Sequence, residues 1–247
     1  MIDERFMRTE LLLGNQALKN LQNSTVALIG VGAVGGYALE ALARAGVGHL
    51  ILVDFDTFDI TNINRQILAL TSTVGQKKVE VARRRVLDIN PKCDVKVEDI
   101  FISDENFDKI FNDKIDFVVD AMDSMKEKCD MMYFLYQKGI PFISSMGAAL
   151  KTDISALKIA KLSKTNYCPM SKKIRKSLVQ RGVDMDKITC VYCAEQKDSG
   201  PKPIIASKDG SKAVLGSLPT ITAMAGLMMA HYVIFELSKG DKNAKYT

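Results

Sequence analysis

Three glycines, Gly30, Gly32 and Gly35, form the pattern Gly-x-Gly-x-x-Gly between a short apolar run and a helical pattern. Glycine permits a tight turn and lets a phosphate approach the backbone, and the N-terminus of the following helix favours an anion. Asp54 ends the next apolar run, where a carboxylate can accept hydrogen bonds from ribose hydroxyls. In this context the pattern favours an adenine nucleotide over a tight turn without a ligand.

Further charged residues belong to the segments after the expected strands. Arg65 follows the second apolar run, Lys78 lies at the start of a charged amphipathic segment, and Asp123 follows another apolar run. Open α/β sheets bind ligands at the carboxyl ends of their strands, so Asp54, Arg65 and Asp123 should converge on the glycine turn. Cations stabilise triphosphate charge and a carboxylate can hold Mg²⁺, which favours attack at a phosphate. Each residue alone would also fit a surface charge or a helix cap.

A nicotinamide-dependent dehydrogenase is an alternative use of such a nucleotide site. It usually needs an acid–base group beside the nicotinamide, and the chain has only 2 histidines. His49 precedes the second apolar run, and His231 lies in a long apolar segment, where a packed core residue is the simpler interpretation. The scarcity of histidine weakens this hypothesis without eliminating it, since a Lys or a Tyr could serve.

The elements that must position these residues alternate between strands and helices. Short apolar runs predict buried parallel strands, and apolar positions at helical spacing predict the helices between them. We predict strands over 25–30, 50–53, 94–98, 115–119 and 141–145, and helices over 11–21, 34–45, 76–89 and 124–138. This alternation predicts an α/β fold with a Rossmann-like, mostly parallel sheet and helices on both faces.

After residue 150 the pattern changes to an elaborated C-terminal part. Strands are predicted over 154–159 and 188–192, with a basic helix near 170–181 and turns at 200–203 and 207–210. No Pro/Gly/Ser-rich linker separates the two halves, so residues 1–247 should form one domain. We assign the nucleotide-binding core to 1–150, and the substrate-binding and dimerisation elements to 151–247.

The composition favours a globular protein of the cytoplasm. The 247 residues are 47% apolar and 26% charged, with a net charge of +5. No basic stretch followed by an apolar core opens the chain, so no signal peptide is expected. The 5 cysteines lack the dense, even spacing of a disulfide scaffold, which fits a reducing compartment. The apolar stretch 218–237 carries Pro219, His231 and Glu236, and therefore predicts a buried core or dimer-interface helix and no membrane span.

Several motifs in the first half follow one another in a fixed order. They are Gly30-x-Gly32-x-x-Gly35, Ala45-Gly-Val-Gly48, Leu52-Val-Asp54-Phe-Asp56, Asn62-x-x-Arg65-Gln66, Val74-Gly-Gln-x-Lys78, Ile89-Asn-Pro91 and Asp120-x-x-Asp123. In this order the chain resembles the adenylating superfamily of ubiquitin-activating enzymes and the ThiF-, MoeB- and HesA-type activators of bacterial sulfur carriers.

The resemblance implies ATP and Mg²⁺ as cofactors and assigns a role to each matching residue. Gly30, Gly32 and Gly35 form the nucleotide turn, with Asp56 and Asn62 among the nucleotide-binding residues and Asp54 at the ribose. Arg65 and Lys78 bind phosphates, and Asp123 supports Mg²⁺. The resemblance also implies a homodimer in which Arg8 reaches the nucleotide of the partner subunit.

Two segments of the second half resemble one branch, the bacterial tRNA threonylcarbamoyladenosine dehydratases. They are Cys168-Pro-Met-Ser-Lys-Lys173-Ile-Arg175-Lys-Ser-Leu, with Cys168 in place of an expected aspartate, and Gly216-Ser-Leu-Pro219-Thr before an apolar helix. This resemblance implies that ATP adenylates the carboxylate of threonylcarbamoyladenosine in tRNA. The carbamoyl group of the same side chain then closes a ring, so that pyrophosphate and AMP are released. Because the nucleophile is intramolecular, no essential cysteine is expected.

Two competing functions follow from the same superfamily. An activator of a ubiquitin-like sulfur carrier would usually carry two Cys-x-x-Cys pairs for zinc, and this chain has one, Cys190 and Cys193. In a strand these two side chains would face opposite sides, so we expect structural cysteines and no zinc. A non-catalytic nucleotide-binding scaffold would have lost Arg65, Lys78 or Asp123, and all three are present. The sequence leaves open a monovalent cation and a sulfur-relay partner.

Positive charge is concentrated in residues 151–187, which contain ten Lys or Arg against three Asp. A basic patch is the electrostatic footprint of a nucleic-acid-binding protein, although a solvated lysine-rich face is the plainer alternative. We therefore predict that this segment contacts tRNA through Lys172, Lys173, Arg175 and Lys176.

Overall fold

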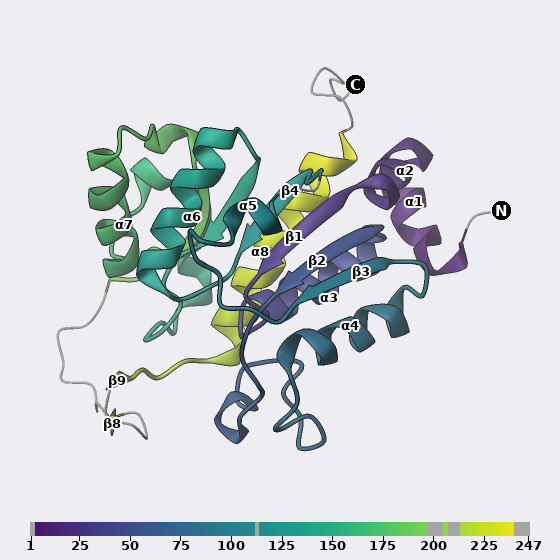
Figure 1. The fold of residues 1–247 in the computed structure, drawn as a ribbon, viewed down its shortest axis with the longest axis horizontal. Coiled ribbons are helices and arrows are strands. Elements are labelled where there is room, and N and C mark those ends of the chain that lie inside the picture. The colour runs from purple at the N-terminus through teal and green to yellow at the C-terminus, as the bar shows by residue number, and fades with distance from the viewer. Residues whose placement is uncertain (1–2, 112–113, 197–204, 207–212, 240–247) are drawn as a thin grey trace.

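The computed structural model describes residues 3–111, 114–196, 205–206 and 213–239. Their centre is a seven-stranded sheet with the order β3-β2-β1-β4-β5-β7-β6 (Figure 1). Its strands are β1 Thr25–Ile29, β2 His49–Val53, β3 Asp94–Glu98, β4 Phe117–Asp120, β5 Phe142–Ser145, β6 Leu157–Lys161 and β7 Thr189–Cys193. All neighbouring pairs are parallel except β6 with β7. A separate two-stranded sheet pairs β8 (Ile205–Ala206) with β9 (Ala213–Val214).

The strand order places a ligand crevice between β1 and β4. From β1 the chain proceeds outward through β2 to β3, and then returns to the other side of β1 as β4. In an open α/β sheet, the loops leaving two such strands diverge and create a crevice at their carboxyl ends. The glycine turn follows β1 and the segment with Asp123 follows β4, so both lie at this crevice.

Helices cover both faces of the sheet, as predicted. The helices are α1 Met7–Leu13, α2 Asn15–Asn23, α3 Gly35–Ala45, α4 Lys78–Ile89, α5 Phe107–Ile110, α6 Met125–Lys138, α7 Pro169–Gln180 and α8 Pro219–Ser238. One face packs against α3, α4 and α8, and the other against α5, α6 and α7. Alternate strand residues supply the two cores, as the period of a strand requires. The α/β architecture is therefore confirmed.

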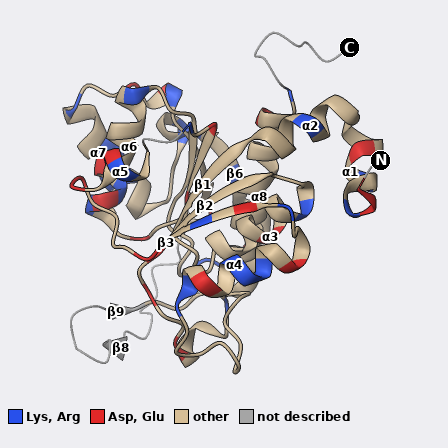
Figure 2. Cartoon of the chain, turned by 45° about the vertical axis from the view of Figure 1, so that its right-hand side comes forward, with Lys and Arg blue, Asp and Glu red and all other residues tan. Residues whose placement is uncertain are grey.

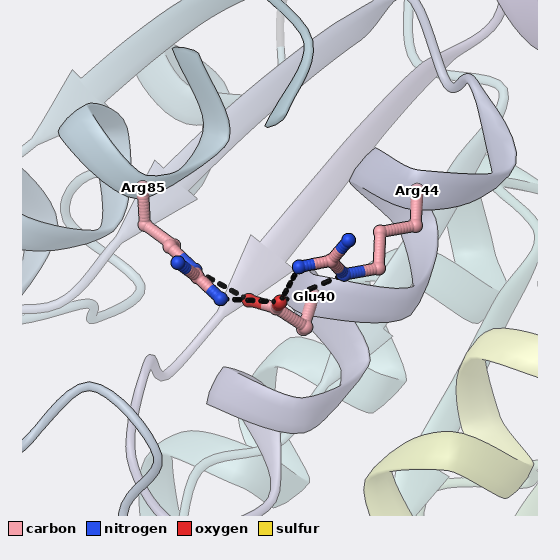
Figure 3. A network of polar contacts seen from close by, with 3 residues as sticks. All are labelled: Glu40, Arg44 and Arg85. Carbon is pink, nitrogen blue, oxygen red and sulfur yellow. Dashed lines mark hydrogen bonds and ion pairs between the residues drawn. The ribbon is translucent and has the colours of Figure 1, made fainter. Parts of the chain in front are cut away.

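A carboxylate joins two of the helices on the first face. Glu40 of α3 accepts hydrogen bonds from Arg44 of the same helix, at 2.6 and 2.8 Å, and from Arg85 of α4, at 2.7 and 2.9 Å (Figure 3). Burial acts to raise the pKa of Glu40, but the two guanidinium groups hold it below its usual value. The ion pair fixes α4, and with it Lys78 at the start of that helix, against α3.

The N-terminal helix predicted over 11–21 is two helices. Gly14, with φ 90° and ψ 160°, ends α1 and begins α2, because only glycine adopts this conformation without strain. Leu18 and Leu21 of α2 are buried, whereas Leu11 and Leu12 of α1 are 79% and 82% exposed. The helix α5 was not predicted at all.

The apolar helix α8 packs closely on α3. A Cβ atom on Gly226 would lie 2.2 Å from the carbonyl oxygen of Val34, so the two backbones meet where glycine allows it. By length and composition alone α8 could cross a membrane, and its buried residues pack on α3 and the sheet. His231 was expected in the core. It is instead exposed, with its ring centroid 4.5 Å from that of Phe235, so that expectation was wrong.

Candidate active site

The turn from β1 into α3 lies against the segment that follows β4. Gly30 has φ +88°, and a Cβ atom there would come within 3.0 Å of the carbonyl oxygen of Ala121. A Cβ atom on Gly35 would lie 1.8 Å from the carbonyl oxygen of Gly30, so only glycine fits at this position. At Gly32 a Cβ atom would meet only the side chain of Gln66, at 3.8 Å, which leaves this part of the backbone open to a ligand.

Asp54, just after β2, is 9% exposed and supports the glycine turn. Its Oδ2 accepts a hydrogen bond from the backbone N–H of Val31 at 2.7 Å, and its Oδ1 accepts one from the N–H of Asp56 at 2.9 Å. Burial raises the pKa of Asp54, while the nearby charge of Lys78 opposes this rise. A carboxylate beside such a turn is able to accept hydrogen bonds from ribose hydroxyls.

Two cations, Lys78 and Arg65, lie in the wall of the same cleft as Asp54. Lys78 is 6% exposed, and its Nζ lies 2.7 Å from Oδ2 of Asp56. Arg65 donates from one guanidinium nitrogen to the carbonyl oxygen of Thr61 at 3.0 Å and to Oδ1 of Asn64 at 2.8 Å. These bonds hold the guanidinium at the wall of the cleft, where its remaining N–H groups can meet phosphate oxygens.

Asp123, in the segment between β4 and α6, is exposed. Among the described residues no hydrogen bond or ion pair occupies its carboxylate. Carboxylate oxygens with free lone pairs are the ligands that Mg²⁺ prefers, usually together with substrate phosphates. The residue therefore fits a magnesium ion bound with ATP.

One cleft of about 900 Å³ brings these groups together. Its wall contains most of the residues predicted for the nucleotide site, namely Gly30, Gly32, Asp54, Asp56, Arg65, Lys78 and Asp123. The same cleft continues along the segment after β5, residues 146–151, to Pro169 and Met170 at the start of α7. It therefore extends from the glycine turn to the N-terminus of α7.

Three predicted residues lie outside the wall of this cleft. Gly35 is buried under the turn. Asn62 uses its side-chain oxygen locally, accepting from the N–H of Asp59 at 3.1 Å in a helix cap. Arg8 is exposed on α1 and does not line the cleft of its own chain.

The basic helix α7 presents only part of its charge to solvent. Lys172, Lys173 and Lys176 are exposed, and Figure 2 shows Lys and Arg at this end of the molecule, among acidic residues. Arg175 is partly buried, and its guanidinium donates to the side chain of Thr165 and, at 2.7 Å, to the carbonyl oxygen of that residue. Arg175 therefore also anchors α7 to the preceding turn.

Cys168 takes the place of a helix-capping residue. The backbone N–H of Ser171 donates to Sγ of Cys168 at 3.5 Å, at the N-terminus of α7. Asp and Asn are among the usual caps at such a position. The sulfur of a cysteine accepts the same hydrogen bond more weakly than a carboxylate or amide oxygen does. The replacement of the expected aspartate thus keeps the cap and removes a charge from beside the cleft.

Sequence reasoning missed two features of the site. Lys128, Asp120 and Ser144 form a fully buried network directly behind the segment that carries Asp123. Phe55 and Phe101 line the cleft as an edge-to-face pair, with ring centroids 5.0 Å apart. Lys128 could have been found, since it shares a helix face with buried Met131 and Met132, where a charge needs a partner.

The pair Cys190 and Cys193 lies in β7, with the side chains on opposite faces as predicted. Cys190 packs into the core beneath α6 and α7, and Cys193 into the core beneath α8. Burial raises the pKa of Cys190 to about 12 and that of Cys193 above its usual value. Neither thiol is set up as a nucleophile, because the thiolate is the reactive form.

Comparison with known proteins agrees with this geometry. The profile of the ThiF family matches residues 5–246. The chain is 40% identical over 248 residues to the tRNA threonylcarbamoyladenosine dehydratase of Bacillus subtilis, with 95% of each chain covered. The structure of the Escherichia coli tRNA N6-threonylcarbamoyladenosine dehydratase in complex with ATP superposes with a TM-score of 0.85, at 30% identity and with 96% of each chain covered.

A relative that acts in the sulfur-carrier branch matches a shorter part of the chain. The molybdopterin-synthase adenylyltransferase of Escherichia coli is 34% identical over 140 residues, which is 57% of this chain and 54% of that protein. The likeness to the Bacillus subtilis dehydratase, over 95% of this chain, therefore includes elements after residue 150.

Proposed function

This chain belongs to the ThiF family, and we propose that it is an ATP-dependent dehydratase that cyclises threonylcarbamoyladenosine in tRNA. The threonyl carboxylate attacks the α-phosphate of ATP, and pyrophosphate leaves. The carbamoyl group of the same side chain then attacks the mixed anhydride, the ring closes, and AMP departs as the carbamoyl group releases an N–H proton. The substrate has lost one water, and effective molarity replaces a catalytic thiol.

The observation that carries this function is the convergence of cations and carboxylates on the glycine turn. Arg65 and Lys78 offer positive charge to the phosphates, and Asp54 offers its carboxylate to the ribose. Asp123 would hold Mg²⁺, which supplies charge neutralisation at the phosphates when bound. His231 on α8 is exposed, and neither it nor His49 lines the cleft, so neither is given a catalytic role.

The experiment is a product analysis with tRNA that carries threonylcarbamoyladenosine. The protein with Mg-ATP should release AMP and pyrophosphate in equal amounts, and the tRNA nucleoside should lose the mass of one water. Asp123→Ala and Arg65→Ala should each lower the rate by at least about 100-fold, since each removes charge stabilisation from the transition state. Asp104→Ala and Arg83→Ala, exposed residues away from the cleft, are the matched controls. Release of ADP, or full activity in both cleft variants, would contradict the assignment.

An activator of a sulfur-carrier protein is not favoured. The relatives named as dehydratases match nearly the whole chain, and the thiols of β7 are buried with raised pKa values. We expect that changing Cys190 and Cys193 together to Ser retains most activity and that the protein binds no stoichiometric zinc. The 5 cysteines are all free thiols, in keeping with the reducing cytoplasm that we propose as its location.

The working unit that we propose is a homodimer. Leu11 and Leu12 of α1 and Met224 and Leu227 of α8 are exposed apolar side chains, which a second subunit could cover. Arg8 lies on α1, one turn before Leu11 and Leu12, and would enter the cleft of the partner subunit, adding positive charge beside the phosphates. Residues 151–239 would then serve substrate binding and dimerisation, with Lys172, Lys173 and Lys176 of α7 as tRNA contacts.

A further inference from the structure

Lys151 is a buried cation in the wall of the cleft for which adenylation has no assigned use. It is 2% exposed and lines the cleft, at the end formed by residues 146–151 and by Pro169 and Met170. The sequence placed it with the exposed lysines of the basic segment. The structure instead places its ammonium group inside, between the segment after β5 and the turn before α7.

Two backbone carbonyl groups hold this ammonium group. Its Nζ donates to the carbonyl oxygen of Tyr167, at 3.3 Å, and to that of Glu195. No carboxylate of the described residues lies within ion-pair distance of it. The carboxylate of Glu195 is engaged elsewhere, accepting from the N–H groups of Thr152 at 2.7 Å and Asp153 at 3.1 Å. An ammonium has three donors, so one remains for a group in the cleft.

The backbone on both sides of this contact adopts costly conformations. Leu150, directly before Lys151, has φ 60°, and Tyr167 has φ 49°. Among the described residues these are the two non-glycine residues with positive φ. Such strain persists only where the surrounding structure enforces it, and it is concentrated at functional sites. Here it accompanies the placement of a charge that is expensive to bury without a counter-ion.

We propose that Lys151 binds the carboxylate of the substrate and orients it for attack on the α-phosphate. The argument rests on the proposed function, which supplies one anionic group besides ATP at this end of the cleft. Arg65 and Lys78 lie at the glycine turn, and Lys78 already has Asp56 as its partner. Among the described residues neither Arg65 nor Lys151 forms an ion pair, but Lys151 lies at the end of the cleft formed by residues 146–151, on the side where α7 would bring tRNA.

The test compares two substrates on two proteins. Lys151→Gln keeps an N–H donor for the carbonyl groups but removes the charge. Binding is measured for tRNA that carries threonylcarbamoyladenosine and for the same tRNA with unmodified adenosine. The native protein should prefer the modified tRNA. In Lys151→Gln this preference should fall by about 10- to 100-fold, the range expected for one lost charge-assisted hydrogen bond, while affinity for unmodified tRNA and for ATP stays the same.

The control and the contrary outcomes separate this proposal from a structural role. Lys158→Gln, the same change at an exposed site in β6, should leave the preference unchanged even if it weakens both complexes. The proposal is overturned if Lys151→Gln keeps the preference for modified tRNA. It is also overturned if the variant loses affinity equally for both tRNAs, or if it loses affinity for ATP. If the variant does not fold, native protein is tested with substrate whose threonyl carboxylate has been converted to the primary amide. Equal affinity for acid and amide then overturns it. Absence of AMP release by the native protein would instead refute the proposed function.

Discussion

The Nζ of Lys128 in α6 lies 2.6 Å from Oδ2 of Asp120 in β4, and neither side chain is exposed to solvent. Ser144 of β5 completes the network, since its hydroxyl donates to the same carboxylate oxygen at 2.6 Å and accepts from Lys128 at 3.1 Å. The remaining oxygen of Asp120 accepts from the N–H of Met122 at 3.3 Å. The pair therefore fixes the segment that carries Asp123 against the ends of two strands.

Breaking this pair should destabilise the protein more than replacing it. Lys128→Met leaves a buried carboxylate without its cation and should lower the free energy of unfolding by about 3–5 kcal/mol. The double change Lys128→Met with Asp120→Leu removes both charges and should recover most of that loss. Urea unfolding of the single and double variants measures this. Equal destabilisation by both would show that the ion pair itself, and not the orphaned charge, dominates.

Arg8 should act in the partner subunit. Arg8→Ala and Asp123→Ala chains should each be inactive. When mixed, they should regain about a quarter of native activity, because half of the dimers then contain one intact site. Subunit exchange is followed by native mass spectrometry and activity by AMP release. Mixed dimers that form and remain inactive would place Arg8 outside the neighbouring cleft.

The exposed lysines of α7 should contribute to tRNA binding, whereas Arg175 should contribute mainly to stability. Changing Lys172, Lys173 and Lys176 together to Ala should weaken tRNA binding and lower the slope of log affinity against log salt by roughly 2 to 3, with ATP binding intact. Arg175→Ala should mainly loosen α7, because its bonds to Thr165 are lost. Filter binding across salt concentrations measures the first effect and thermal unfolding the second. Lys19→Ala with Arg83→Ala, two exposed cations elsewhere, is the control, and an unchanged salt slope in the triple variant would contradict tRNA contact.

Glu195 should make stability depend on acid pH. Its hydrogen bonds from Thr152 and Asp153 lower its pKa from 4.5 to about 2. Because the pKa of Glu195 is lower in the folded state than in the unfolded state, its ionised form stabilises the fold at pH values above the unfolded-state pKa. This contribution is lost as pH falls from about 4.5 to about 2. Glu195→Gln should therefore lower Tm by roughly 2–4 °C at pH 7, for a contribution of about 1 kcal/mol, and the difference should shrink below pH 4.5. Calorimetry from pH 7 to pH 3, with exposed Glu105→Gln as control, tests this, and a constant difference would exclude the linkage.

The parts of the fold that local pattern determines were predictable. The strand over 94–98 was predicted with its bounds, and the motif residues Asp54, Arg65, Lys78 and Asp123 converge as the strand order requires. The break at Gly14 was missed because a single glycine inside an apolar periodic run is also tolerated in a helix. The turns predicted over 200–203 and 207–210 lie outside the described residues. Charge counting grouped Lys151 with the surface lysines, since only tertiary contacts such as those of Tyr167 and Glu195 distinguish a buried lysine from an exposed one.

The collision at Gly35 limits what its motif can reveal about any protein that carries it. A side chain there would strike the carbonyl oxygen of Gly30 whether or not a nucleotide is bound, so the requirement comes from the backbone crossing between β1 and α3. A relative that had lost catalysis would still need this glycine in order to fold. The last glycine of the pattern is therefore a marker of architecture, whereas Asp123, whose exposed carboxylate has no hydrogen-bond or ion-pair partner among the described residues, is a position at which activity could be lost without loss of the fold.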